Sequence, residues 1–140
     1  MPIGTKIVAS RAGIVIATEE QYTDDDHTPF HENFVLIEHD DGTFARYFHL
    51  TQNGALVEVG DSVSQLEVIA LSGNSGKSSA GPHLHFDVFK EVHNGKDFCD
   101  RQHETTLDFR LCSSLPLSFL NSELTDCGLR FGILYEAFSF

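Results

Sequence analysis

Apolar and polar positions alternate over short stretches of residues 1–90 in this 140-residue chain, which is the pattern of β-strands with one buried face. Turn-forming residues separate these stretches, and Asp40-Asp41-Gly42-Thr43 is typical of a β-hairpin turn. No helical period is sustained before residue 100. The pattern predicts strands at residues 6–9, 13–18, 33–39, 44–50, either side of a turn in 57–63, 67–72 and 83–90. We therefore expect an all-β, antiparallel, barrel-like domain of short strands.

Two segments do not follow this alternation. Residues 19–32 are polar and aperiodic, which predicts a long loop. After residue 92 the pattern weakens, although residues 105–111 fit one more strand and residues 113–140 are apolar in patches. We expect a core at residues 1–92 and a less regular C-terminal extension at 93–140. That extension could be an edge element, a tail that binds a protein partner, or a poorly ordered end.

Composition and charge limit the classes of partner that the protein is expected to bind. Hydrophobic residues make up 41% and charged residues 21%, which suits a globular protein, and twelve Phe with no Trp favour β structure. The formal charge of −12 argues against nucleic acid and anionic membrane surfaces as partners. Between residues 12 and 45 there is no Lys or Arg but there are nine acidic residues, for which a solvated loop is favoured over a cation or basic-peptide site.

The sequence shows no clear pattern for export, membrane insertion, disulfide bonds or nucleotide binding. The three cysteines show no CxxC spacing and imply no disulfide framework. The chain starts without the pattern of a signal peptide and has no apolar run long enough to span a membrane, so we expect neither an export signal nor membrane insertion. Gly76-Lys77-Ser78 resembles the end of a phosphate-binding loop, but the first glycine is replaced by Leu71 and a strand follows, so nucleotide binding is rejected.

The strongest chemical signal is Gly81-Pro82-His83-Leu84-His85-Phe86. Because strand side chains alternate, His83 and His85 are predicted on one face, with Leu84, Phe86 and Val88 directed into a core. Two imidazoles side by side suit metal ligation or acid–base chemistry. Asp87 shares the histidine face, where a solvent-exposed carboxylate is favoured over a role in orienting a histidine.

Several motifs in the same order resemble the LytM/lysostaphin-type zinc metallopeptidases, over roughly residues 3–90. They are Gly4-Thr5-Lys6-Ile7-Val8-Ala9, Gly13-Ile14-Val15, Ile37-Glu38-His39-Asp40-Asp41-Gly42, Tyr47-Phe48-His49-Leu50, Val59-Gly60-Asp61-Ser62-Val63, Ser72-Gly73-Asn74-Ser75-Gly76 and the histidine motif above. Each motif alone is weak, whereas the ordered combination is specific.

The resemblance implies a fold, a cofactor and roles. It implies a β-sheet domain of the duplicated hybrid motif type and a bound Zn²⁺, with His85 as a metal ligand and His49 and His83 as catalytic residues. Zinc would act as a Lewis acid and activate water, and the neighbouring imidazoles would handle protons. The implied substrate is a peptidoglycan cross-link or another Gly-rich peptide, and the implied location is periplasmic or extracellular.

The sequence departs from the family at the metal site. The family takes two further ligands from a His-x-x-x-Asp segment just before the opening strand, where this sequence has Met1-Pro2-Ile3-Gly4. A catalytic zinc needs about three protein ligands, and His85 is the ligand that carries over. We therefore expect an N-terminally truncated or degenerate metallopeptidase domain. Substitute ligands in Asp24-Asp25-Asp26-His27 or at His31 are not favoured, because they fall in the predicted loop.

Two alternatives stay open. The first is a catalytically inactive domain of the same fold that binds cell wall or regulates another hydrolase. The second, more remote, is a phosphohistidine carrier of related barrel fold that uses His83 or His85 as the phosphate acceptor, whereas Lys77 is not at the hairpin tip that a biotinyl or lipoyl carrier needs. His39 is predicted to be structural, and no site is assigned to His93, His103 or the cysteines.

Overall fold

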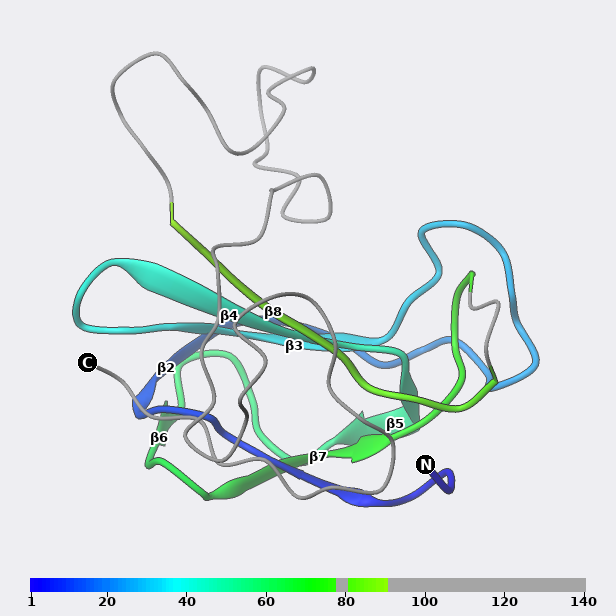
Figure 1. The fold of residues 1–140 in the computed structure, drawn as a ribbon, viewed down its shortest axis with the longest axis horizontal. Coiled ribbons are helices and arrows are strands. Elements are labelled where there is room, and N and C mark those ends of the chain that lie inside the picture. The colour runs from blue at the N-terminus through cyan, green and yellow to red at the C-terminus, as the bar shows by residue number, and fades with distance from the viewer. Residues whose placement is uncertain (78–80, 91–140) are drawn as a thin grey trace, which may run out of the picture.

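The computed structural model describes residues 1–77 and 81–90, which form eight strands and, within those ranges, no helix. Two antiparallel sheets lie in layers (Figure 1), one in the order β1-β7-β5 and the other in the order β6-β2-β3-β4-β8. This confirms the predicted all-β antiparallel class. The strands are β1 (Lys6–Val8), β2 (Gly13–Glu19), β3 (Phe34–Glu38), β4 (Thr43–Phe48), β5 (Leu50–Ala55), β6 (Ser62–Val63), β7 (Val68–Ser72) and β8 (His85–Lys90).

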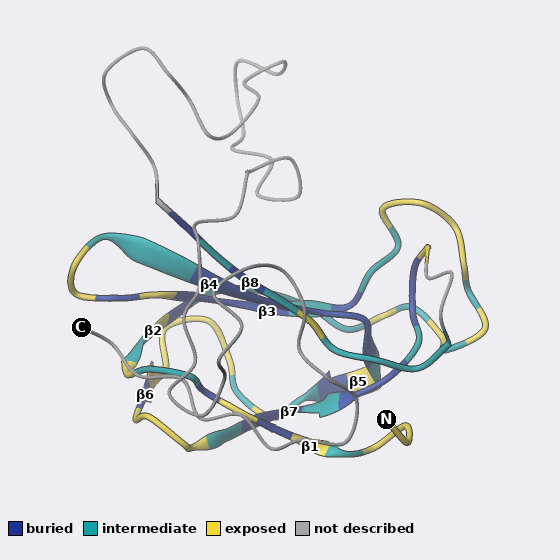
Figure 2. Ribbon diagram, viewed as in Figure 1, coloured by how far each residue is buried: buried dark blue, intermediate teal, exposed yellow. Residues whose placement is uncertain are grey.

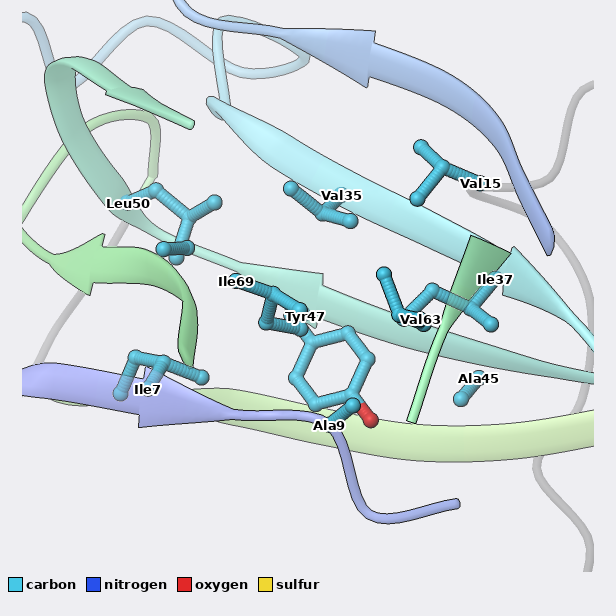
Figure 3. Close-up of a cluster of buried hydrophobic side chains, with 11 residues drawn as sticks. Ile7, Ala9, Val15, Val35, Ile37, Ala45, Tyr47, Leu50, Val63 and Ile69 are labelled. Carbon is cyan, nitrogen blue, oxygen red and sulfur yellow. The ribbon is translucent and has the colours of Figure 1, made fainter. Parts of the chain in front are cut away.

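The main core lies between the two sheets (Figure 3). Alternate residues of β3 and β4 supply one side of it, and β1 and β7 supply the other. The partly buried side chains of Leu84, Phe86 and Val88 pack against this core, as the alternation predicts. Its fully or almost fully buried members are Ile7, Ala9, Val15, Val35, Ile37, Ala45, Tyr47, Leu50, Val63, Ile69 and Ala70.

The opposite face of the five-stranded sheet carries a second apolar cluster. Leu36 and Phe89 are fully buried there, with Phe34 and Phe44 packed against them. Figure 2 accordingly shows buried residues along β3 and β4. The two central strands are therefore covered on both faces, which gives the residues that follow them a rigid support.

The strand boundaries differ from the prediction at three places that matter for the site. The predicted strand 44–50 is broken at His49, where the chain leaves β4 and enters β5. The sequence pattern missed β5 because its Gln52 and Asn53 are exposed and its pairing with β7 is irregular. β8 begins at His85, so His83 precedes the strand and does not share its alternation. In residues 57–63 only β6 forms.

Several sequence predictions fall outside the described residues. These are the strand at 105–111, the C-terminal extension from residue 93, both histidines of that extension and all three cysteines. Residues 19–32 do form a loop, apart from Glu19 at the end of β2. Within residues 1–77 and 81–90 there is no helix able to cross a membrane.

Candidate functional site, a cluster of three histidines

His49 occupies the corner between the two sheets. It follows β4 directly and precedes β5, and its φ of 64° lies in the left-handed region, which costs a non-glycine residue about 1–2 kcal/mol. Its side chain is 6% exposed, and its carbonyl oxygen accepts a hydrogen bond from the N–H of Gly73 at 2.8 Å. Because of this backbone conformation, the His49 side chain does not continue the alternation of inward and outward side chains along β4.

One hydrogen bond sets the tautomer of His49. Its Nδ1 lies 2.7 Å from the carbonyl oxygen of Ser75, and a carbonyl can only accept. Nδ1 therefore carries the proton in the neutral ring, and Nε2 carries the lone pair. Burial lowers the pKa of His49 below its ordinary value, and the charges of His83 and His85 act in the same direction, while the Ser75 carbonyl and Glu32 oppose them. His49 is thus a neutral base at neutral pH.

His83 makes a similar hydrogen bond through Nδ1. Its Nδ1 lies 2.8 Å from the carbonyl oxygen of Gly81, so its proton is also on Nδ1 when the ring is neutral. The centroids of the His83 and His49 rings are 4.8 Å apart, with an interplanar angle of 42°. The cluster therefore holds two adjacent imidazoles whose Nε2 atoms are acceptors, a pair suited to exchanging protons with one bound water or substrate.

His85 completes the cluster at the start of β8. It pairs with Phe48 across β4 and β8, and its ring centroid lies 6.0 Å from that of His49. Its side chain is 49% exposed, the most open of the three. Its Nε2 is 4.0 Å from Oδ2 of Asp87, which is beyond hydrogen-bond distance but within the range of an ion pair. Although His83 lies outside the strand, the structure brings all three predicted histidines together.

The prediction for the exposure of Asp87 was wrong. A solvent-exposed carboxylate was favoured, but Asp87 is 4% exposed. Arg46, its cross-strand partner in β4, donates from Nε to Oδ1 at 2.6 Å and from Nη2 to Oδ2. The Arg46 guanidinium also lies over the rings of Phe89 and Phe48, with centroid distances of 4.8 and 5.6 Å. A buried, bidentate ion pair therefore stands beside His85.

Sequence reasoning missed Arg46. The available signal was a lone arginine in an otherwise apolar strand, since a charged residue in such a position is buried only when it is paired. The alternation alone could not identify Asp87 as the partner, because that requires the register between β4 and β8.

The proposed substitute metal ligands have other partners. Asp26 binds Nδ1 of His31 at 2.8 Å, and this contact is the main reason why the pKa of Asp26 is lowered to about 2. Asp24 accepts hydrogen bonds from the Thr51 hydroxyl at 2.6 Å and from the backbone N–H of Asn74 at 2.7 Å. The Asp24 carboxylate therefore fixes the loop of residues 20–33 to Thr51 and Asn74, whereas the Asp26 carboxylate acts within the loop.

The described residues do not make a zinc site by themselves. Among residues 1–77 and 81–90, no three His, Cys, Asp or Glu side chains converge in a group that could hold a metal ion. The three clustered imidazoles do not form such a group. His39, in contrast, is buried at the far end of β3 with Nδ1 2.8 Å from the Ala12 carbonyl oxygen, consistent with its predicted structural role.

Comparison with known proteins identifies relatives of this arrangement. Residues 1–98 match peptidase family M23. The peptidoglycan DD-endopeptidase ShyA of Vibrio cholerae is 39% identical over 88 residues, which cover 63% of this chain and 18% of ShyA. The chain spans 18% to 25% of the length of the curated relatives that it matches.

Two solved structures support the same relationship. LytU superposes with a TM-score of 0.55 at 33% identity, covering 69% of this chain and 63% of LytU. A zinc-containing peptidase from Vibrio cholerae gives a TM-score of 0.52 at 35% identity, covering 63% of this chain and 24% of that peptidase.

Proposed function

The chain belongs to peptidase family M23, and on this premise we propose that it is the peptide-hydrolysing domain of a peptidoglycan endopeptidase. The observation that carries the proposal is the cluster of His49, His83 and His85, in which the ring centroids of His49 and His83 lie 4.8 Å apart and each ring directs Nδ1 to a carbonyl oxygen. Hydrolysis of a peptide bond needs one group to take a proton from water and another to deliver a proton to the reacting peptide.

In this proposal His49 and His83 are the catalytic residues. The Ser75 and Gly81 carbonyl oxygens hold each ring in the Nδ1–H tautomer, so that each Nε2 can accept a proton from water and then donate it. Once protonated, either Nε2–H can donate a hydrogen bond to the oxyanion that develops on the peptide carbonyl. The lowered pKa of His49 favours release of its proton in the second half of the cycle.

His85 is proposed as the metal ligand of the described residues. Membership of M23 and the zinc-containing relative imply a zinc cofactor. The described residues hold no group of three metal-binding side chains, and we propose that the remaining ligands lie outside these residues. Asp87 is proposed to orient His85, because its Oδ2 stands 4.0 Å from the His85 Nε2 and is fixed by Arg46.

The same premise suggests a substrate and a location. ShyA is a peptidoglycan DD-endopeptidase, and we take the cross-linking peptides of peptidoglycan as the substrate class of this domain. Peptidoglycan lies outside the cytoplasmic membrane, so the proposed site of action is periplasmic or extracellular. We further propose residues 1–92 as the M23 core and residues 93–140 as an extension with a separate role, for which binding of a protein partner is a candidate.

A second function is favoured by one observation. Because no three metal-binding side chains converge within the described ranges, the domain could bind cell wall or regulate another hydrolase without cleaving. This function needs the fold, but it does not need the proton transfers of His49 and His83.

The deciding experiment measures zinc content and cleavage together. The chain is assayed as it stands and with a His-x-x-x-Asp segment added before Met1, whose amino group donates to the carbonyl oxygen of Pro82, the residue before His83, at 2.8 Å. Zinc content and cleavage of cross-linked muropeptides are followed by mass spectrometry. We expect zinc-dependent cleavage by the zinc-loaded form, reduced about 10²- to 10⁴-fold in His49→Asn and His83→Asn.

The controls separate the two functions. His39→Gln serves as the matched control, because it changes a buried histidine at the other end of β3 and should leave cleavage unchanged. His85→Ala should lose zinc. A folded, zinc-loaded protein that cleaves nothing, yet binds peptidoglycan equally well with and without His83→Asn, would overturn the peptidase proposal and support the binding function.

A further inference from the structure

Asn33 uses every polar atom of its side chain in a fully buried position just before β3. Its Oδ1 accepts from the N–H of Tyr22 at 3.0 Å, and its Nδ2 donates to the carbonyl oxygens of Tyr22 at 2.7 Å and Leu50 at 3.2 Å. Its backbone N–H donates to Oγ of Ser75 at 3.0 Å, and its carbonyl oxygen accepts from the N–H of Leu50 at 3.2 Å. One residue therefore joins three segments that are distant in sequence.

Ser75 passes this connection on to His49. Ser75 is fully buried, and its Oγ accepts from Asn33 and donates to the carbonyl oxygen of Leu50 at 2.7 Å. Its own carbonyl oxygen accepts the Nδ1–H of His49 at 2.7 Å. Asn33 thus reaches His49 by two routes, through Ser75 and through Leu50, the residue covalently next to His49.

The segment that carries Ser75 needs such an anchor. Residues 73–77 belong to no strand, so no ladder of backbone hydrogen bonds fixes the Ser75 carbonyl. Hydrogen bonds weaken steeply once the donor and acceptor separate by more than a few tenths of an ångström or lose alignment. A small displacement of Ser75 would therefore release the His49 ring, which could then rotate or exchange its proton between Nδ1 and Nε2.

We propose that Asn33 is a positioning residue that, through Ser75 and Leu50, holds His49 in the Nδ1–H tautomer with Nε2 presented to the histidine cluster. The inference deepens the proposed function, since it rests on His49 being catalytic. Asn33 touches neither of the other two histidines in any contact found among the described residues, so its effect on the cluster passes through His49.

Nitrogen NMR of the histidine rings tests the proposal directly. At a pH where His49 is neutral, the ring-nitrogen shifts give the ratio of the two tautomers, and solvent exchange reports on the Nδ1–H. In Asn33→Ala we expect the Nε2–H tautomer of His49 to rise about fivefold, the factor that corresponds to weakening one neutral hydrogen bond, with faster exchange of any remaining Nδ1–H. The matched control is His39→Ala, which removes another buried polar side chain at the opposite end of β3 and should leave His49 unchanged.

Two outcomes would overturn the proposal. The first is a folded Asn33→Ala protein whose His49 keeps the original tautomer ratio and exchange rate. If Asn33→Ala does not fold, Ser75→Ala is measured instead. This variant keeps the carbonyl of residue 75 but deletes the hydroxyl that bonds Asn33 and Leu50. An unchanged tautomer ratio of His49 in Ser75→Ala would overturn the proposal equally. Since neither readout involves peptide cleavage, failure of this inference and failure of the peptidase function are measured separately.

Discussion

The buried pair of Arg46 and Asp87 yields the sharpest test of how this site is supported. The two side chains are 4% and 6% exposed, their contact is bidentate, and the Arg46 guanidinium lies over the rings of Phe48 and Phe89. Arg46→Met keeps much of the packing volume but leaves the Asp87 carboxylate without its guanidinium partner. Breaking a buried pair in this way costs about 3–5 kcal/mol, a large part of the roughly 5–15 kcal/mol that stabilises a domain.

Replacing both partners should behave differently. Arg46→Met combined with Asp87→Leu removes both buried charges, and such apolar replacements are often neutral or stabilising. We expect Arg46→Met alone to lower the urea midpoint by about 2 M, for a denaturant slope of roughly 2 kcal/mol/M, and the double variant to recover most of that loss. The double variant should nevertheless weaken zinc binding and any cleavage, because the carboxylate beside His85 is gone.

Urea unfolding at pH 7, followed by circular dichroism, measures the stability of the original protein, Arg46→Met, Asp87→Leu and the double variant. The conservative variant Arg46→Lys retains a charge but not the bidentate geometry, so it should fall between the original protein and Arg46→Met. A loss below about 1 kcal/mol for Arg46→Met, or a double variant no more stable than the single one, would show that the pair does not behave as a desolvated ion pair.

Three further predictions concern the fold around the site. Burial lowers the pKa of His39, so protonation of His39 destabilises the folded protein relative to the unfolded chain. Between pH 7 and pH 5 the difference in unfolding free energy between the original protein and His39→Gln should therefore narrow as the pH falls. A constant difference would contradict this. Gly73→Ala should destabilise the protein by about 1–3 kcal/mol, because the added Cβ would lie 2.2 Å from the backbone nitrogen of Thr51. In thermal unfolding it should lower the midpoint more than Gly4→Ala, whose Cβ would meet no atom within 4 Å although its backbone has a positive φ. Tyr47→Phe should cost about 1–2 kcal/mol in the same assay, because the lost hydroxyl bonds the backbone N–H and the side chain of Ser10 at 2.8 and 2.9 Å; an unchanged midpoint would refute it.

Local sequence features predicted much of the sheet and the identity of the site. Short apolar stretches bounded by turn residues identified β1, β2, β3 and β7, and Asp40-Asp41-Gly42-Thr43 marked the β3–β4 hairpin. The ordered motifs around Tyr47-Phe48-His49-Leu50 and the His-x-His pair indicated the family, since they combine residue type with chain order. The pattern failed at β5, whose exposed polar side chains do not carry the apolar alternation of a buried strand.

Only the tertiary structure decided how the three histidines work together. The break at His49, its left-handed backbone and the Ser75 carbonyl that selects its tautomer depend on contacts between segments far apart in the chain. The burial of Asp87 depends on the register that places Arg46 opposite it. The sequence by itself determined which imidazoles are present and which strands they adjoin. Their protonation and neighbours were decided by tertiary structure, because hydrogen-bond partners and burial are properties of packed surfaces rather than of residue type.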